Sequence, residues 1–183
     1  GWGGFALEAA RTTGCRVTSI TVSQRQLEEA QARAAAAGLA DRVTFELRDY
    51  RNVEGRFDRI VSIEMLEAVG CSFLGTYFSA LDRALKPDGL AAIQVITIPD
   101  QRYAAYSRSV DWIQKHIFPG GHLPSLGALC AAMTAHSSLH VESVENIGPH
   151  YAPTLRAWRD AFDGTTVDVG ERDGLPRGQG HRL

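Results

Sequence analysis

The sequence predicts an α/β domain in which a doubly wound, parallel sheet carries helices on both faces. Short β-rich segments alternate with segments of helical periodicity, the pattern of such a sheet. Residues 90–98 are almost continuously apolar, which is typical of a central strand covered on both faces. With 183 residues and 44% hydrophobic content, the chain can bury one full core. We therefore expect one domain over residues 1–163 and a disordered or foreign tail over residues 164–183, where periodicity is lost.

The chain begins with a glycine loop that leads into a helix. Residues 1–4 read Gly-Trp-Gly-Gly, and residues 5–11 have helical apolar spacing that ends before Gly14. Because glycine lets a backbone approach a ligand closely, this loop is a candidate binding element.

A strand, a helix and a second strand come next. Residues 16–22 are rich in β-formers. Ser23, with Gln26 three residues later, predicts a capping box that starts a helix ending at Gly38. Residues 43–47 alternate apolar and polar side chains, as a half-buried strand does.

The third strand leads into a pair of carboxylates around which we expect the functional site. Residues 57–63 form an apolar strand, and Glu64 and Glu67 follow it before Gly70. In an open α/β sheet, ligands bind outside the carboxyl ends of the strands, so Glu67 is the first catalytic candidate. The alternative is that both acids open a surface helix and offset the positive end of its dipole.

The alternation continues through the middle of the chain. Residues 74–85 have helical spacing, and the turn residues 86–89 stop that helix. The apolar run 90–98 contains Gln94, whose amide either bonds neighbouring backbone or faces a ligand. Residues 102–117 keep helical phase and predict an amphipathic helix that lies over the site.

The last predicted elements follow a loop rich in proline and glycine at residues 118–124. Ser125 caps a further helix that runs to about residue 137. Residues 139–147 predict another strand, so Tyr151 is expected just past a strand end. A short helix follows, with apolar side chains in phase over residues 155–162.

Composition argues against several classes of partner. A formal net charge of -2 without a Lys/Arg cluster gives no reason to expect nucleic acid. The longest apolar runs fall far short of the ~20 residues that span a bilayer. Cys15, Cys71 and Cys130 are widely spaced and form no Cys-x-x-Cys pair, so we expect no metal site and a reducing compartment. No signal sequence is apparent, which favours a cytoplasmic protein.

Aromatic and imidazole side chains near the strand ends are ambiguous. Tyr50 could stack on a purine, although an aromatic at a strand end packs in the core more often. His116, His122 and His150 are single histidines, which are usually packing or surface groups. The chain has no GxGxxG match, which disfavours a nicotinamide cofactor.

Five segments carry a resemblance to a known family: residues 1–4 (Gly-Trp-Gly-Gly), 21–26 (Thr-Val-Ser-Gln-Arg-Gln), 67–70 (Glu-Ala-Val-Gly), 117–125 (Ile-Phe-Pro-Gly-Gly-His-Leu-Pro-Ser) and 149–155 (Pro-His-Tyr-Ala-Pro-Thr-Leu). Together they resemble the cyclopropane-fatty-acyl-phospholipid synthases and the related mycolic acid cyclopropane synthases. The resemblance covers residues 1 to about 162. It implies a Rossmann-like methyltransferase sheet, here without the first strand and the C-terminal closing strand.

The resemblance also implies an S-adenosylmethionine site. The implied cofactor contacts are the loop residues, the turn after the first strand and the pair beside the adenine: Gly1, Trp2, Gly3, Thr21, Ser23, Gln26, Tyr50 and Arg51. Independently, the aromatic faces of Trp2 and Tyr50 suit a sulfonium cation.

The implied reaction transfers the cofactor methyl group to a cis double bond of an unsaturated phospholipid acyl chain and then removes a proton to close a cyclopropane ring. By resemblance, a bicarbonate ion serves as base and is held by Glu67, Gln94, Ile96 and Tyr151. Gln94 stands where better-known members carry histidine, and an amide can bond the ion but cannot take up its proton. A homodimer and peripheral contact with the inner membrane face are also expected.

Two other functions fit the same residues. One is a different methyltransferase on this scaffold, which forms a methyl-branched lipid or methylates a small amine. The other is a non-catalytic, cofactor-binding fragment, which the absent first strand favours.

Overall fold

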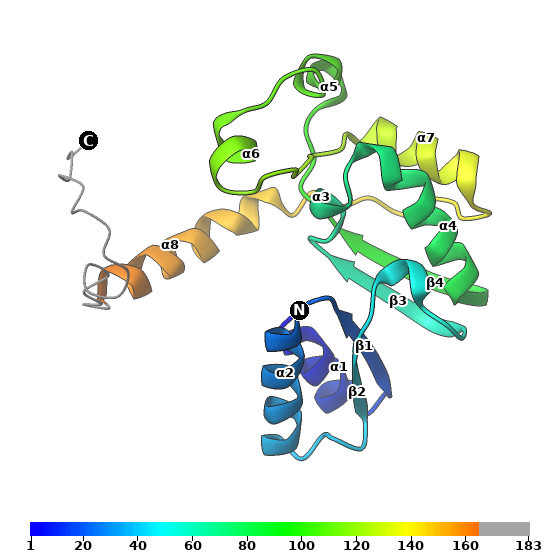
Figure 1. Cartoon of the computed structure of the whole chain (residues 1–183), viewed down its shortest axis with the longest axis vertical. Coiled ribbons are helices and arrows are strands. Elements are labelled where there is room, and N and C mark those ends of the chain that lie inside the picture. Colours follow the sequence, from blue (N-terminus) through cyan, green and yellow to red (C-terminus); the bar gives the residue numbers. More distant parts are fainter. Residues whose placement is uncertain (165–183) are drawn as a thin grey trace. The chain divides into compact units, whose positions relative to one another are not determined.

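The computed structural model describes residues 1–164, in which strands and helices alternate as far as residue 94 and only helices follow (Figure 1). The chain divides into two compact units, Gly1–His140 and Val141–Leu183. The predicted single core over residues 1–163 stays a prediction. The predicted tail lies outside the described residues, apart from Gly164.

The first unit holds all the strands of the described chain. Its elements are α1 (Gly4–Thr13), β1 (Val17–Thr21), α2 (Gln24–Ala36), β2 (Val43–Leu47), η1 (Tyr50–Asn52), β3 (Phe57–Ile63), α3 (Leu66–Val69), η2 (Cys71–Phe73), α4 (Leu74–Ala84), β4 (Leu85–Gln94), α5 (Asp100–Tyr106), α6 (Trp112–His116) and α7 (Leu126–His136). The second unit contains α8 (Gly148–Gly164).

The strands are parallel, which confirms the predicted α/β class. β1 pairs with β2, so that Val17 lies opposite Val43, and β3 pairs with β4, so that Ile63 lies opposite Gln94. Over residues 1–164 the strands thus form two hydrogen-bonded pairs. β4 has β3 as its one neighbour there and leaves Leu90 51% exposed, so the prediction of a strand covered on both faces is wrong for this segment. An apolar sequence makes a strand suitable for a buried position, but it does not by itself place other elements against that strand.

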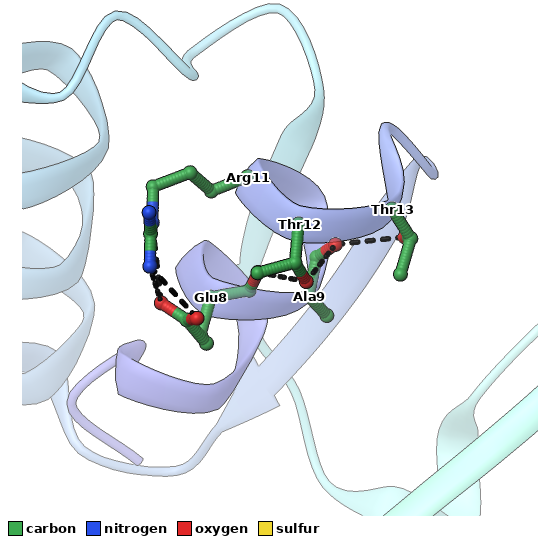
Figure 2. Close-up of polar contacts among 5 residues, drawn as sticks. All are labelled: Glu8, Ala9, Arg11, Thr12 and Thr13. Atoms are coloured by element: carbon green, nitrogen blue, oxygen red, sulfur yellow. Dashed lines mark hydrogen bonds and ion pairs between the residues drawn. The ribbon is translucent and has the colours of Figure 1, made fainter.

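Helix α1 ends with local polar contacts (Figure 2). The Arg11 guanidinium forms an ion pair with the Glu8 carboxylate, and the Thr12 and Thr13 hydroxyls donate to the carbonyls of Glu8 and Ala9, each at 2.8 Å. Gly14 then closes the helix in the left-handed conformation, as predicted. Exposed pairs of this kind contribute little to stability, so α1 depends on its buried face.

Two apolar clusters hold the first unit together. In the smaller one, Ala6 and Ala10 of α1 pack on Val43 of β2. The larger one joins α3, α4 and α7 and consists of Leu66, Leu74, Tyr77, Phe78, Leu81 and Leu129. The apolar phase of residues 74–85 therefore predicted the buried face of α4 correctly.

The predicted helix over residues 102–117 is two helices, α5 and α6. Between them the Ser109 hydroxyl donates to the Tyr106 carbonyl, and Asp111 forms a complete capping box with Gln114 that starts α6. Serine and aspartate compete with the helical backbone for hydrogen bonds, which explains a break that apolar spacing alone does not reveal.

The predicted strand over residues 139–147 is also wrong, because this segment is neither strand nor helix. Its alternating pattern leaves Val141 and Val144 exposed. Alternating side chains make a segment compatible with a strand, but a strand forms only where its backbone groups pair with those of another strand. Tyr151 therefore does not follow a strand end but lies within α8, which begins earlier than predicted and includes Pro153.

The turn predicted at residues 86–89 is part of β4. The pairing of β3 with β4 shifts register between Phe57 and Arg59, and Asp88 has a positive φ of 62°. The turn-forming residues thus produce an irregularity within the strand and do not end it. β4 ends at Gln94, earlier than the predicted end at residue 98.

No helix within residues 1–164 is long and apolar enough to cross a bilayer. In the same range, no three His, Cys, Asp or Glu side chains are grouped to hold a metal ion.

Gly3 and Gly4 make a matched pair for testing the glycine loop. Gly3 has a φ of +83°, and a Cβ there would lie 3.0 Å from the Ala30 Cβ and 3.0 Å from the Phe45 ring, whereas a Cβ on Gly4 meets nothing within 4 Å. We expect Gly3→Ala to lower the free energy of unfolding by roughly 1–3 kcal/mol, because it adds both left-handed strain and overpacking. Gly4→Ala should be neutral or stabilising by up to about 1 kcal/mol. Urea unfolding measures both changes, and equal midpoints would contradict the left-handed, closely packed conformation of Gly3.

Candidate functional site

The ends of β1 and β2 lie side by side. Thr21 ends β1 opposite Leu47, and the Arg48 N–H donates to the Thr21 carbonyl at 2.9 Å. Two of the strand ends that were expected to border the cofactor site are therefore neighbours.

The turn after β1 is a closed hydrogen-bond ring. The Thr21 hydroxyl donates to the Gln26 side-chain oxygen at 2.6 Å and accepts from the Ser23 N–H at 3.2 Å. The Ser23 hydroxyl in turn accepts from the Gln26 N–H at 3.3 Å. Only half of the predicted capping box forms, because the Gln26 side chain bonds Thr21 and not the Ser23 backbone. Three candidate cofactor residues are thereby fixed in one turn at the start of α2.

The glycine loop lies against the same strand and helix pair. Gly3 is in van der Waals contact distance of α2 and β2, through Ala30 and Phe45. Trp2 is 49% exposed, and its carbonyl accepts a hydrogen bond from Arg33 of α2 at 3.4 Å. Gly1 precedes it at the surface. The loop thus presents an open indole face, as a cationic ligand requires.

A depression beside this loop is lined by Trp2, Arg25, Glu28 and Glu29. It is wide open and includes one candidate cofactor residue, Trp2. We therefore do not identify it with the cofactor site.

Tyr50 and Arg51 belong to the short helix η1. Asp49 caps this helix, and its carboxylate accepts from the Arg51 backbone N–H at 2.9 Å and from the guanidinium at 2.8 and 2.7 Å. These hydrogen bonds, first those of the Arg51 side chain, lower the pKa of Asp49 to about 2. The Arg51 guanidinium lies 5.9 Å from the centre of the Tyr50 ring.

The Tyr50 ring packs in the core, which is one of the two roles considered for it. It is half-buried and packs at 5.8 Å on the ring of Tyr77 in the larger apolar cluster. Burial raises the pKa of its hydroxyl. Tyr50 is therefore a core residue at one side, and its other side remains partly open at the end of β2.

Glu67 is held at two points. One carboxylate oxygen, Oε1, accepts from the Ile96 N–H at 2.6 Å, and the Glu67 carbonyl accepts from the His122 N–H at 2.8 Å. The second carboxylate oxygen, Oε2, is buried and makes no hydrogen bond within the described chain. A buried, unbonded carboxylate oxygen is costly, and a charge that merely opened a surface helix would face water. The geometry therefore favours a functional carboxylate.

Ile96 and Gln94 differ in their relation to Glu67. Ile96 supplies a backbone N–H to it, whereas the Gln94 amide donates to Glu64 Oε1 at 3.1 Å. Glu64 has a φ of +49°, an unusual conformation for a residue other than glycine. The Gln94 amide is thus bonded to a neighbouring side chain, and the structure brings Ile96, but not Gln94, into contact with Glu67.

Two buried polar residues near Glu67 were not predicted. The hydroxyls of Tyr77 and Ser62 are buried without a hydrogen bond in the described structure. Burial raises the pKa of Tyr77 to about 12, and the Glu67 charge adds to this effect. Tyr77 belongs to the larger apolar cluster, and the sequence analysis did not single it out.

Tyr151 lies on α8 in the second unit. Its expected place beside Glu67 stays a prediction.

The family model described as mycolic acid cyclopropane synthetase matches residues 1–172 of the chain. Tuberculostearic acid methyltransferase UfaA1 from Mycobacterium tuberculosis is 43% identical over 175 residues, which cover 96% of this chain and 39% of the relative. Cyclopropane-fatty-acyl-phospholipid synthase from Escherichia coli is 38% identical over 163 residues, with 88% and 40% covered. The chain thus spans about two fifths of the length of these curated relatives.

Solved structures agree with these matches. The mycolic acid cyclopropane synthase CmaA1, complexed with SAH and CTAB, superposes with a TM-score of 0.78 at 28% identity and covers 90% of this chain and 61% of its own. Geranyl diphosphate methyltransferase in complex with SAM has a TM-score of 0.73 at 23% identity, with 92% and 65% covered, and shows the shared fold.

The η1 cap provides a test of the turn that carries Tyr50. We expect Arg51→Met to raise the pKa of Asp49 from about 2 towards its usual 3.8, because the guanidinium bonds are lost while the backbone bond remains. Arg83→Met is the control, since that guanidinium bonds the Arg51 carbonyl and not the carboxylate. Carbon-13 NMR titration of the Asp49 carboxyl measures both. If the pKa of Asp49 is unchanged in Arg51→Met, the guanidinium does not bond the Asp49 carboxylate in solution.

Proposed function

The chain belongs to the mycolic acid cyclopropane synthetase family, and from this premise we propose that it is an S-adenosylmethionine-dependent C-methyltransferase that acts on the cis double bond of unsaturated phospholipid acyl chains. The observation that carries the proposal is Glu67, a carboxylate fixed by the Ile96 N–H with its second oxygen buried and unbonded. Such a group suits a reaction that must remove a proton at a defined place.

The cofactor would be held by the loop and strand ends of the first pair. The backbone at Gly1 and Gly3 and the exposed indole of Trp2 suit a close, cationic ligand, and the Thr21, Ser23 and Gln26 turn offers hydroxyl and amide groups to its polar portions. Tyr50 and Arg51 form the flank expected beside the adenine. When bound, S-adenosylmethionine supplies the methyl group.

The proposed chemistry needs one new carbon–carbon bond and one proton transfer. The methyl carbon bonds to one alkene carbon as its bond to sulfur breaks, which leaves a positive charge on the other alkene carbon. Loss of a proton from the added methyl group then lets the freed electron pair close the three-membered ring. We assign Glu67 Oε2 to holding the base that removes this proton, because it is a buried carboxylate oxygen without a hydrogen bond in the described residues.

A bicarbonate ion fits part of the site. Glu67 Oε2 could accept a hydrogen bond from it. The single Ile96 N–H already donates to Glu67 and would have to exchange that bond to hold the ion. The Gln94 amide nitrogen uses one hydrogen on Glu64 and keeps a second that could donate to the ion. Tyr151 is the fourth group proposed to hold it. Bicarbonate would supply a base without a strong nucleophile.

A methyl-branched product is the second candidate. It is favoured by the greater identity to the tuberculostearic acid methyltransferase, 43%, than to the cyclopropane synthase, 38%. This product would form if the cation lost a proton to give an alkene and not a ring, and a saturated branch would further need a hydride donor.

The proposed substrate indicates where in the cell the protein would act. Acyl chains of phospholipids are reached at a membrane surface, so we propose peripheral contact with the inner face of the membrane, in a cytoplasmic protein that forms a homodimer.

The proposal is tested by incubating the intact protein with methyl-labelled S-adenosylmethionine and vesicles of unsaturated phosphatidylethanolamine. Mass spectrometry of the released fatty acids should show one added carbon, and hydrogenation distinguishes a ring from a branch. We expect Glu67→Gln to lower turnover at least tenfold, since loss of a positioned base typically costs ~10² to 10⁴ in rate. Melting temperature and cofactor affinity should stay close to those of the unchanged protein.

Glu64→Gln is the matched control, because it removes a neighbouring carboxylate charge while keeping an oxygen for the Gln94 amide. Its turnover should stay within about threefold of the unchanged protein, as expected for a small surface effect. If Glu67→Gln turns over normally, or loses activity only in step with stability, Glu67 is a helix-opening charge and the assignment is wrong.

A further inference from the structure

Two segments of the first unit run together next to Glu67. The Ile98 N–H donates to the Pro124 carbonyl at 3.0 Å, and the Asp100 carboxylate accepts from the Gly127 N–H at 3.0 Å. These two hydrogen bonds join the start of α5 to the start of α7. The loop of residues 118–124 immediately precedes this junction.

Side chains from α5 and α6 hold the loop further along. The Leu123 N–H donates to the Tyr106 hydroxyl at 3.1 Å, and the Gln114 amide donates to the Gly121 carbonyl at 2.9 Å. Tyr103 makes the third contact, with its hydroxyl 2.9 Å from His122 Nε2. The loop is therefore fastened at three consecutive residues by three different side chains.

The contact between Tyr103 and His122 is well defined. Their rings meet edge-on at 5.5 Å, and the Tyr106 ring lies 5.5 Å from the imidazole. Cys71 Sγ lies 3.4 Å from the Tyr103 hydroxyl. Burial lowers the pKa of His122 and raises that of Tyr103 to about 12, so near neutral pH the pair is an uncharged imidazole and an intact phenol.

His122 is also the residue that touches Glu67. Its backbone N–H donates to the Glu67 carbonyl at 2.8 Å. The preceding Gly121 leaves little room, since a Cβ there would lie 3.0 Å from the Phe118 carbonyl oxygen. The imidazole of His122 is thus bound by the Tyr103 hydroxyl, and the backbone N–H of His122 is bound to the Glu67 carbonyl.

We propose that Tyr103 and His122 are positioning residues that fix the backbone of Glu67 through the loop of residues 118–124. The effect on catalysis rests on the proposed function, whereas the mechanical link does not. Gly120 and Gly121 give the middle of this loop wide conformational freedom between Pro119 and Pro124, so side chains that hold residues 121–123 help to fix its place. Small displacements of a catalytic group are costly, which makes such supporting contacts important.

Tyr103→Phe isolates the proposed bond, because it keeps the ring contacts and removes the hydroxyl alone. Hydrogen exchange of the His122 amide, measured by NMR in the intact protein, should quicken about tenfold. In the lipid assay kcat should fall about five- to tenfold, while the KM for S-adenosylmethionine stays within twofold. His122→Gln, whose amide reaches about as far as Nε2, should lie between the unchanged protein and His122→Leu in both measurements.

Ser109→Ala is the matched control, since it removes a hydroxyl bond within the same part of the chain that does not reach the loop. Its His122 exchange should match that of the unchanged protein. Unchanged His122 exchange in Tyr103→Phe overturns the proposal, whether or not kcat falls. If His122 exchange is faster in Tyr103→Phe but kcat is unchanged, the hydrogen bond holds the loop but does not position Glu67 for catalysis. That result also overturns the proposal. If the unchanged protein turns over no lipid, the proposed function fails, while faster exchange still supports the link to Glu67.

Discussion

The hydrogen bond from the Ile96 N–H to Glu67 is the contact on which the candidate site depends. At 2.6 Å it turns the carboxylate inward from α3 towards the segment after β4. The parallel pairing of β3 with β4 makes this possible, because Ile63 lies opposite Gln94 and both strands end at the same edge. The chain then approaches Glu67 a second time at His122. A four-residue helix that could not hold a side chain by itself is thus fixed by two distant segments.

The two strand pairs carry different parts of the proposed site. The first pair carries the Thr21 turn and the glycine loop, which suit a cofactor, while the second carries Glu67 and its supports, which suit the acceptor of a proton. Tyr50 joins them within the first unit, because it follows β2 and packs on Tyr77 of α4. Arg83 of α4 adds a bond to the Arg51 carbonyl at 2.8 Å. The two functions are therefore linked through α4.

Much of this arrangement could be predicted where the local pattern and the tertiary structure agree. The strands at residues 17–21, 43–47 and 57–63 and the α4 face followed from periodicity, and Glu67 followed from its place after β3. The break at Ser107–Asp111 could not, because polar side chains there override a continuous apolar phase. The strand predicted at residues 139–147 failed for a different reason, since alternation is compatible with a strand but does not by itself provide the backbone pairing that makes one. The roles of Tyr103, His122 and Tyr77 depend on contacts between distant segments, which no local pattern encodes.

In the proposed site, the ends of β1 and β2 hold the cofactor, while Glu67 is fixed at the end of the second strand pair. A crystal structure of the intact protein with S-adenosylhomocysteine tests this arrangement most directly. We expect the adenine to contact Tyr50, the methionine portion to reach the turn formed by Thr21, Ser23 and Gln26, and Glu67 Oε1 to remain on the Ile96 N–H. A cofactor bound more than one residue layer from Tyr50, or a Glu67 carboxylate turned out into solvent, would contradict it.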